Sequence, residues 1–503
     1  MRITKILILL FCAGALAAGM GCNKILDQEV QGSFTPGEFF TSDANALLAT
    51  NAAYKPLAFN AGATNAIWVL GDVASDDAIK GVNDGDQADF IAVDQFNIAL
   101  NNAAVEAVWT NYYNGVFLCN VVLDGLTGNT AVTEATAKSC MAQAKFLRAY
   151  YYFILASAYG NIPLHLKVET AQEAQSPVVS QDLIFTQIEK DCSEAIPDLP
   201  GKAEAELGRA TKGAATALLA KTYLFHTSLA NNYQLAAQTA AQLDGMGYSL
   251  TDRYYDNFSA ATKDNSEAIF TVNHVEGTRG LGNELNAWFA PRSLAGYGFF
   301  YPTSSLVNNY ETAWGGEVDP RLDYTVARTG QPYFETDFDP SWSTTGYLTK
   351  KMVQPLSEVP TTTKNVGTVN YEALRLADLL LVQAEALNES GHSADALEPL
   401  NRVRKRARES YLFDESLPGF GAVPAGLLPD ITTTDQVQLR NIIRRERRSE
   451  LALEFHRFFD VIRYGSAYAN AALKPDAPNF DYNTHKWFPI PQSERDANPN
   501  LFK

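Results

Sequence analysis

The sequence predicts an all-α dominated protein in which antiparallel helix pairs surround one aromatic, loop-rich insertion lobe. Three observations predict this class. Long segments carry apolar residues at helical spacing, short turns rich in Gly, Pro or Asn separate them, and residues 254–347 abandon the helical pattern. A chain of 503 residues can bury a large core, either as one body or as two merged lobes.

Residues that start or stop a helix bound most of the expected helices. Ser42 and Ser180 are N-cap residues in front of the first and fourth helices. Gly160 and Gly391 are placed to end the third and seventh, and Pro197 forbids continuation of the fourth. The expected ranges are 44–59, 103–126, 134–159, 181–196, 211–227, 233–245, 371–390 and 394–408.

These helices are expected to form degenerate tetratricopeptide-like pairs that build a right-handed scaffold. Asn231 and Asn232 make the short turn between the fifth and sixth helices, and small residues such as Ala384 and Ala396 allow close approach in the last pair. The strict repeat of about 34 residues is absent. An irregular helical bundle therefore stays open as the alternative.

The N-terminus carries an export signal. Arg2 and Lys5 precede the apolar run 6–18, which is too short to span a membrane permanently, and Gly19-Met20-Gly21 leads into Cys22. The ending is similar to a bacterial lipobox, in which this cysteine is lipidated and becomes the first mature residue. The alternative is an ordinary secreted protein with a chance cysteine.

Charge and cysteine content exclude several classes of function. Forty basic and 57 acidic residues give a net charge of −17, and loss of Arg2 and Lys5 with the signal leaves 38 against 57, or −19. Such a surface repels nucleic acid and anionic lipid. Cys119, Cys140 and Cys192 remain in the mature chain at long spacings, so neither a disulfide framework nor a zinc site is expected. We expect them to be small buried residues on helices.

Several long motifs follow one another along the chain. They are AQAKFLRAYYYF at 142–153 with YGNIPL at 159–164, DPR at 319–321, RLADLLLVQAEA at 375–386, IIRRERRSELALEFHRFFDVIRYG at 442–465 and FPIPQSERDANPNL at 488–501. Together with the lipobox, they resemble the signatures of the SusD/RagB family of nutrient-binding lipoproteins, in the expected order. Departures are mild: Phe455 replaces Gly, Asn161 replaces Asp and Tyr464 replaces Trp.

The resemblance implies a division of the chain and a role for each part. Residues 1–21 form the lipoprotein signal peptide, 22–40 a lipidated tether, and 41–250 an N-terminal helical region. Residues 251–370 form the ligand-binding lobe, and 371–503 form a C-terminal helical region ending in an extended strap. A member of this family is expected to lie on the outer membrane over a SusC-like TonB-dependent transporter and to pass oligosaccharides into it. A peptide ligand is the alternative within the family.

The arginine-rich motif near the C-terminus predicts a lattice of internal ion pairs rather than a nucleic-acid site. Its acidic residues lie at helical spacing among the arginines, so i±3 pairs are possible. The expected pairs are Glu450–Arg447, Glu454–Arg457 and Asp460–Arg463. In an acidic protein, such a lattice would hold one last helix against the repeats.

Aromatic residues concentrate in the loop-rich segment. Residues 254–347 contain 18 aromatics in 94 positions, about 19% against 11% for the chain. Aromatic faces stack on the C–H faces of sugars, so we expect Trp288, Tyr297, Tyr301 and Trp314 to bind ligand by stacking. The alternative for any one of them is a place in the core of the lobe.

An acidic loop from Trp68 to Phe90 is the second candidate for ligand contacts. The resemblance places it near the ligand face, so Asp76 and Asp77 are expected to supply polar contacts, although solvated carboxylates are the default interpretation. Asp84-x-Asp86 hints at calcium, but the loop lacks the Gly and Glu positions of an EF-hand. We expect no cofactor and no metal.

Three functions fit the sequence to different degrees. A non-catalytic glycan-binding lipoprotein needs a helical scaffold, a lipid tether and an aromatic surface, all of which are predicted. A glycoside hydrolase needs two carboxylates that face one bond, but the adjacent Asp76 and Asp77 would point in different directions. No nucleophile, metalloprotease or nucleotide-binding motif is found. A transporter-docking scaffold without its own ligand is the third candidate.

Overall fold

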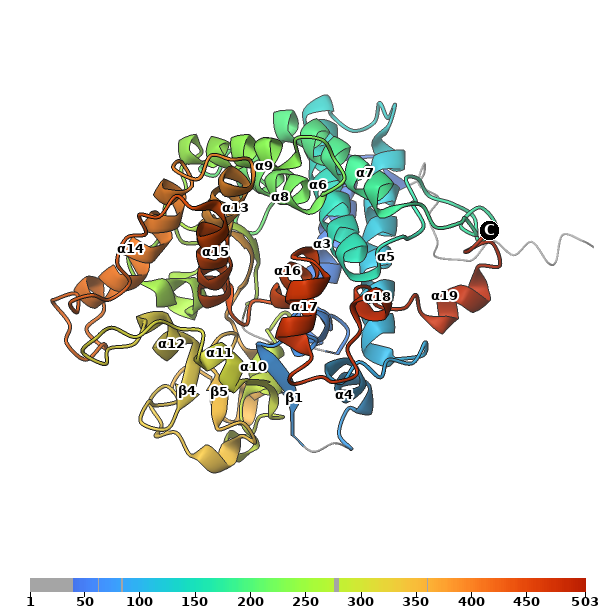
Figure 1. Ribbon diagram of the computed structural model, residues 1–503. Helices are drawn as coiled ribbons and strands as arrows, with labels where there is room; N and C mark the ends of the chain where they lie inside the picture. The colour runs from blue at the N-terminus through green and yellow to red at the C-terminus, as the bar shows by residue number, and fades with distance from the viewer. Residues whose placement is uncertain (1–38, 62, 83–84, 276–279, 360) are drawn as a thin grey trace, which may run out of the picture.

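Helices lie side by side along the upper arc of the molecule, and short strands fill its lower part (Figure 1). The computed structural model describes residues 39–61, 63–82, 85–275, 280–359 and 361–503. The expected signal peptide, Cys22 and Asp84 lie outside these residues. The all-α dominated prediction is confirmed, whereas the tetratricopeptide-like geometry stays a prediction.

The N-terminal layer is a series of helices in which each packs against the next. Ser42, Thr133 and Ser180 accept hydrogen bonds from the backbone N–H groups of the helices that they cap, as N-cap residues do. From α5 to α9 the contacts run between consecutive helices, and α9 then packs against α13. The helices of this layer are α3 (Asp43–Tyr54), α5 (Ala103–Leu126), α6 (Glu134–Tyr159), α7 (Gln181–Ala195), α8 (Lys212–Phe225) and α9 (Asn232–Ala241).

The lobe, together with the acidic loop and the start of the C-terminal region, contains short helices and three two-stranded antiparallel sheets. The sheets are β1 (Ala78–Gly81) with β3 (Phe299–Pro302), β2 (Ala268–Val272) with β6 (Tyr371–Arg375), and β4 (Val326–Arg328) with β5 (Tyr347–Thr349). The helices are the π-helix η3 (Val69–Val73), α4 (Ala88–Asp94), α10 (Leu285–Phe289), α11 (Ser304–Val307) and α12 (Pro320–Thr325). Loops make up much of the lobe, as its Gly and Pro content predicts.

The C-terminal region returns to helices and ends in an extended strap. Phe488 N–H donates to the Ala158 carbonyl at 2.8 Å, and Val178 N–H donates to the Leu501 carbonyl at 3.0 Å. The strap therefore ties the end of the chain to the N-terminal layer. The helices of this region are α13 (Leu376–Glu389), α14 (Leu397–Phe413), α15 (Gln436–Leu451), α16 (Arg457–Arg463), α17 (Ser466–Leu473), α18 (Tyr482–His485) and α19 (Gln492–Ala497).

Two of the departures from the expected helix bounds have an identified physical reason. Residues 371–375 of the expected helix 371–390 form strand β6, because pairing with β2 buries all five of them. The expected last helix is broken between α15 and α16, where Leu453 and Phe455 have φ values of 62° and 69°. Phe455 therefore adopts the left-handed conformation that glycine favours, at the position where the family signature has glycine.

The cysteines and the strongly apolar helices lie inside the protein. Cys119, Cys140 and Cys192 are buried and unpaired on α5, α6 and α7, as expected. Within the described residues, a large hydrophobic core draws on side chains from Phe40 to Leu501. No helix in the described part of the chain is long and apolar enough to cross a membrane.

A lattice of buried ion pairs surrounds α15. The expected Asp460–Arg463 pair is present at 2.9 Å. Arg447 does not pair with Glu450 as expected. It contacts Asp378 of α13 and Asp460 of α16 at 2.5 and 2.6 Å, so its partners come from other elements. The lattice is internal, as predicted, but it joins elements more often than it runs along one helix.

Glu450 is the centre of this lattice. Its carboxylate binds Arg321 at 2.8 Å and Arg375 at 2.6 Å, and it also pairs with Arg406. Burial acts to raise the pKa of Glu450, but the three guanidinium groups together hold it below its usual range. Glu450 is thus a charged group whose partners come from the lobe, β6 and α14.

Candidate ligand-binding surface

The acidic loop and the aromatic lobe share one cluster of rings. Trp68, which is buried, lies 5.3 Å from Phe90, 5.9 Å from Trp288, 5.2 Å from Phe289 and 5.7 Å from Phe300 between ring centroids. Most of these contacts are edge-to-face, the arrangement that aromatic quadrupoles favour. Much of the aromatic content of the lobe therefore holds it to the loop.

Trp288 lies in this cluster and is only 7% exposed. Its indole N–H donates to the Glu284 carboxylate at 3.2 Å, and its ring packs 5.0 Å from Phe299. The expectation that Trp288 lies on the surface and stacks on a ligand is therefore wrong. Trp288 fills the core of the lobe, the alternative already considered for any single aromatic.

Tyr301 is buried as well, at 4% exposure on β3. Its hydroxyl donates to the Trp342 carbonyl at 3.1 Å, and its ring packs where Gly81 and Gly298 leave room. Burial raises the pKa of this phenol. Like Trp288, it supports the lobe from inside.

Asp76 and Asp77 are also buried, which corrects their expected place in a solvated loop. The Nε of Arg457 donates to Asp76 at 2.7 Å, and the Nε of Arg448 donates to Asp77 at 2.6 Å. Burial acts to raise the pKa of Asp76, but Arg457 and Arg448 hold it below its usual range. The two carboxylates dock the loop onto the C-terminal region instead of facing a ligand.

Trp314 is fully exposed at the tip of a tight hairpin. Thr312 and Val318 form a β-bridge, and the Ala313 N–H donates to the Glu317 carbonyl at 2.7 Å. Gly316 takes the left-handed conformation that the turn requires, with φ of 96°. The hairpin therefore holds the indole outside the body.

The base of the hairpin is anchored to the ion-pair lattice. Glu311 binds Arg404 at 2.9 Å, and Arg404 in turn binds Glu446 of α15 at 2.6 Å. Ala313 packs in a small apolar cluster with Tyr411 and other residues of the α14 region. Trp314 thus projects from a fixed support, with the exposed carboxylate of Glu317 on the same turn.

Tyr297 is the other exposed aromatic among the expected residues, at 42%. Its ring lies edge-to-face with Trp288 at 5.6 Å, and its carbonyl accepts from Arg292 at 3.1 Å. Arg292 also pairs with Asp86, and both side chains are substantially exposed. Tyr297 therefore has an aromatic support below it and a charged pair beside it.

The sequence did not predict the ion pair between Arg292 and Asp86. They are 206 positions apart, and no spacing rule connects a loop aspartate to an arginine in another lobe. The described residues contain no group of three or more His, Cys, Asp or Glu side chains that could hold a metal ion. Asp86 is engaged with a cation, which disfavours the calcium interpretation of this loop.

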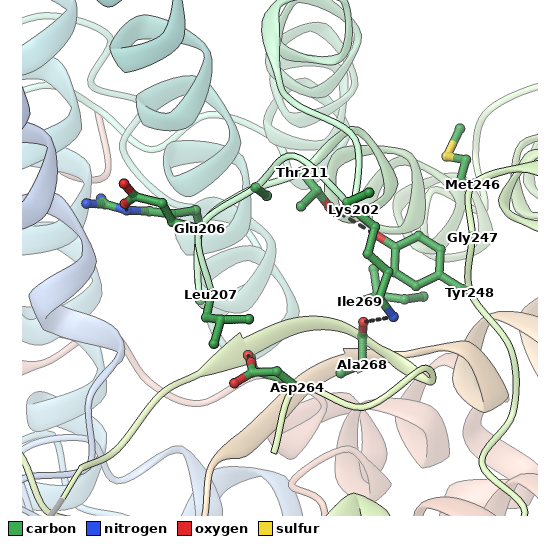
Figure 2. A pocket seen from close by; sticks show the side chains of 15 residues that line it. Lys202, Glu206, Leu207, Thr211, Met246, Gly247, Tyr248, Asp264, Ala268 and Ile269 are labelled. Carbon is green, nitrogen blue, oxygen red and sulfur yellow. Dashed lines mark hydrogen bonds and ion pairs between the residues drawn. The ribbon is translucent and has the colours of Figure 1, made fainter. Parts of the chain in front are cut away.

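A separate open pocket of about 420 Å³ lies between the N-terminus of α8 and strand β2 (Figure 2). The Lys202 ammonium lies 4.4 Å from the centroid of the Tyr248 ring. It also donates to the carbonyls of Asn265, Ser266 and Ala268 at 3.0, 2.8 and 3.3 Å. Its ammonium is thus already bound by backbone. None of the six expected ligand residues lines this pocket.

Comparison with known proteins decides the family. A model described as the SusD family matches residues 266–503, and one described as "Starch-binding associating with outer membrane" matches residues 49–224. The chain belongs to the SusD/RagB family. A SusD-like protein of Formosa agariphila is 27% identical over 525 residues, covering 96% of this chain and 96% of its own length. The starch-binding protein SusD of Bacteroides thetaiotaomicron is 23% identical and covers 76% of this chain and 75% of its own.

Solved SusD-like structures share the fold over most of the chain. A SusD-like carbohydrate-binding protein of Bacteroides fragilis has a TM-score of 0.76 at 25% identity, covering 92% of this chain and 99% of its own. A laminarin-binding SusD-like protein has a TM-score of 0.74 at 27% identity, with the same coverage. The SusD/RagB family binds glycans and associates with the outer membrane. Its signature motifs in this chain lie largely in the core and the ion-pair lattice, and none of them contains Trp314.

Proposed function

We propose that this protein is a non-catalytic cell-surface lipoprotein that captures oligosaccharides and delivers them to a SusC-like TonB-dependent transporter. Trp314 is the observation that carries the proposal. A complete indole stands outside the body of a glycan-binding family member, on a hairpin whose base is fixed by buried charges. Both faces of the ring are open to a sugar.

The chemistry around Trp314 suits a polyhydroxylated ligand. An indole face stacks on the C–H groups of a pyranose, and carboxylates and guanidinium groups bind its hydroxyls. Glu317 lies on the same turn, and Arg445, which is exposed on α15, lies 3.9 Å from Glu311 at the hairpin base. Tyr297, with the Arg292–Asp86 pair beside it, is proposed as a second contact point.

The state of two candidate carboxylates supports the proposed lack of catalysis. Asp76 and Asp77 are each bound by an arginine inside the protein, so neither is available to attack or protonate a glycosidic bond. The lipid on Cys22 and the transporter rest on the family. They supply the tether and the destination that a capture protein needs.

Tryptophan fluorescence of residues 23–503 against a panel of glycans and a pool of peptides tests the proposal. We expect saturable quenching by one class of glycan, and Trp314→Ala should weaken that binding at least tenfold. Leu183→Ala is the matched control, because Leu183 is an exposed apolar residue on α7, far along the chain from the hairpin.

Other outcomes assign the protein to the alternatives. A response to peptides alone would move it to peptide capture, as in a RagB-like protein. Silence from both, with co-purification of a transporter, would leave a docking scaffold. Full glycan affinity in Trp314→Ala would reject the hairpin as the binding site while leaving glycan capture intact.

A further inference from the structure

An apolar groove of about 460 Å³ runs between α3 and α5, next to the first described residues. All nine residues that line it are apolar. Leu48 and Phe117, two of these residues, are 59% and 47% exposed. An exposed apolar groove of this kind is typical of a surface that another segment covers.

The first described residues, Phe39 and Phe40, are a fixed part of the groove. Phe39 and Phe40 form part of its wall, and the Phe40 ring lies against Gly125, where a Cβ would come within 2.2 Å of it. The Asn45 side chain donates to the Phe39 carbonyl at 2.7 Å, and that of Asn129 donates to the Phe40 carbonyl at 2.9 Å. Phe39, the first described residue, therefore lies fixed in the wall of the groove.

We propose that the segment 23–38, which joins Cys22 to the body, packs into this groove through Leu26, Val30 and Phe34. These three residues recur at every fourth position, so they share one face of either a helix or a strand. Phe34 is five positions from Phe39, a distance of at most about 18 Å along the chain. The wall of the groove along one helix, from Phe117 to Val121, covers only about 6 Å, so Phe34 reaches all of it.

Covalent attachment favours this occupant over a separate partner. A linked segment competes with an effective concentration in the millimolar range, which a second copy or a transporter does not match in dilute solution. The docking needs neither a glycan nor a lipid. It is therefore independent of the proposed function and can be tested without either.

Docking changes the length of the tether, a consequence that does rest on lipidation of Cys22. Sixteen free residues extend as far as about 55 Å. With residues from Leu26 onward on the body, only Asn23, Lys24 and Ile25 remain, which span about 10 Å. The segment then holds the α3–α5 end of the body close to the anchor.

Limited proteolysis of residues 23–503 with a glutamate-specific protease tests the docking, read by mass spectrometry of the N-terminal fragments. Glu29 and Glu38 are the sites within the segment. We expect Phe117→Asp and Phe34→Asp each to speed cleavage at these sites at least tenfold. The double variant should be cleaved no faster than either single variant, because both remove the same contact. Leu183→Asp, which places the same charge at an exposed position on α7, should match the parent.

The proposal is overturned if Glu29 and Glu38 are cleaved equally fast in the parent and in both variants. A hydrophobic dye gives a second measurement that does not depend on protease access: Phe34→Asp should raise its fluorescence by uncovering the groove, and an unchanged signal also overturns the proposal. A parent dimer that Phe117→Asp dissociates would assign the groove to a second copy. Parent binding to phosphatidylcholine vesicles that Phe117→Asp abolishes would assign it to the membrane.

Discussion

Helix α15 and the Trp314 hairpin differ in which kind of side chain they bury, although the Arg404–Glu311 ion pair connects the two regions. On α15, charged residues such as Glu450 are fully buried and bound by several partners. On the hairpin, the largest apolar side chain is fully exposed. The arginine-rich motif of α15 is therefore structural in this chain, and the Trp314 hairpin is the surface that we propose for a ligand.

The largest expected effect comes from breaking the lattice. Arg375 binds Glu267, Glu450 and Glu454 at 2.8, 2.6 and 2.8 Å. Arg375→Ala leaves buried carboxylates without their partner, so we expect it to lower the free energy of unfolding by about 3–5 kcal/mol, measured by urea denaturation. In the control Arg402→Ala, loss of an exposed pair with Asp244 should cost less than about 1 kcal/mol. Similar costs for the two variants would contradict the importance of burial.

Acid should lower the stability of the folded protein through the buried His274. Burial lowers its pKa to about 4, so the unfolded chain binds a proton more readily than the folded one between pH 6.5 and 4. Stability from this residue is therefore present above pH 6.5 and is lost as the pH falls toward 4, by on the order of 3 kcal/mol. His274→Gln should flatten the pH dependence of unfolding in this window.

Phe455→Gly tests whether the departure from the family motif is a cost or a gain. The glycine would relieve a left-handed backbone, which costs about 1–2 kcal/mol in other residues. It would also remove a ring that packs 5.2 Å from Tyr371 and 5.9 Å from Phe59, worth about 3–5 kcal/mol. We expect a net loss of about 2 kcal/mol in thermal or urea unfolding. A more stable variant would show that the ring packs poorly.

The smallest expected effect is on the exposed side. Trp314→Ala should change the free energy of unfolding by less than about 0.5 kcal/mol, since the ring buries nothing in the free protein. Trp288→Ala, by contrast, removes a core ring and should cost about 3–5 kcal/mol. Calorimetry of the two variants separates a surface tryptophan from a core tryptophan in the same lobe.

Local signals were sufficient for the long helices. The bounds of α5 and α6 agree with the expected 103–126 and 134–159, because caps and helical spacing act within a few residues. They failed for 371–375, where pairing with a strand about 100 residues away overrides helical propensity. The break before α16 also depends on a distant group, the Asp72 carboxylate, which accepts from the N–H groups of Phe455 and Arg457 at 2.7 and 3.2 Å.

The candidate site was harder to predict than the fold. The aromatic content located the lobe, but content does not reveal which face a ring takes, so Trp288 and Tyr301 were expected outside and lie inside. Asp76 and Asp77 were expected in a solvent-exposed loop, because their partners Arg448 and Arg457 are more than 370 positions away in the sequence. Trp314 is followed directly by two glycines at a turn, and this local context was the best available sign of exposure.

The C-terminal strap has a consequence for the order in which the protein is made and matures. Asn498 donates to the Ser176 carbonyl across 322 positions, and Phe488 closes over the end of α6. A chain made from its N-terminus cannot complete its first-made layer until its last residues have been added. Completion of the N-terminal layer then waits on synthesis of the whole polypeptide, which leaves that layer incompletely packed for the full time of synthesis.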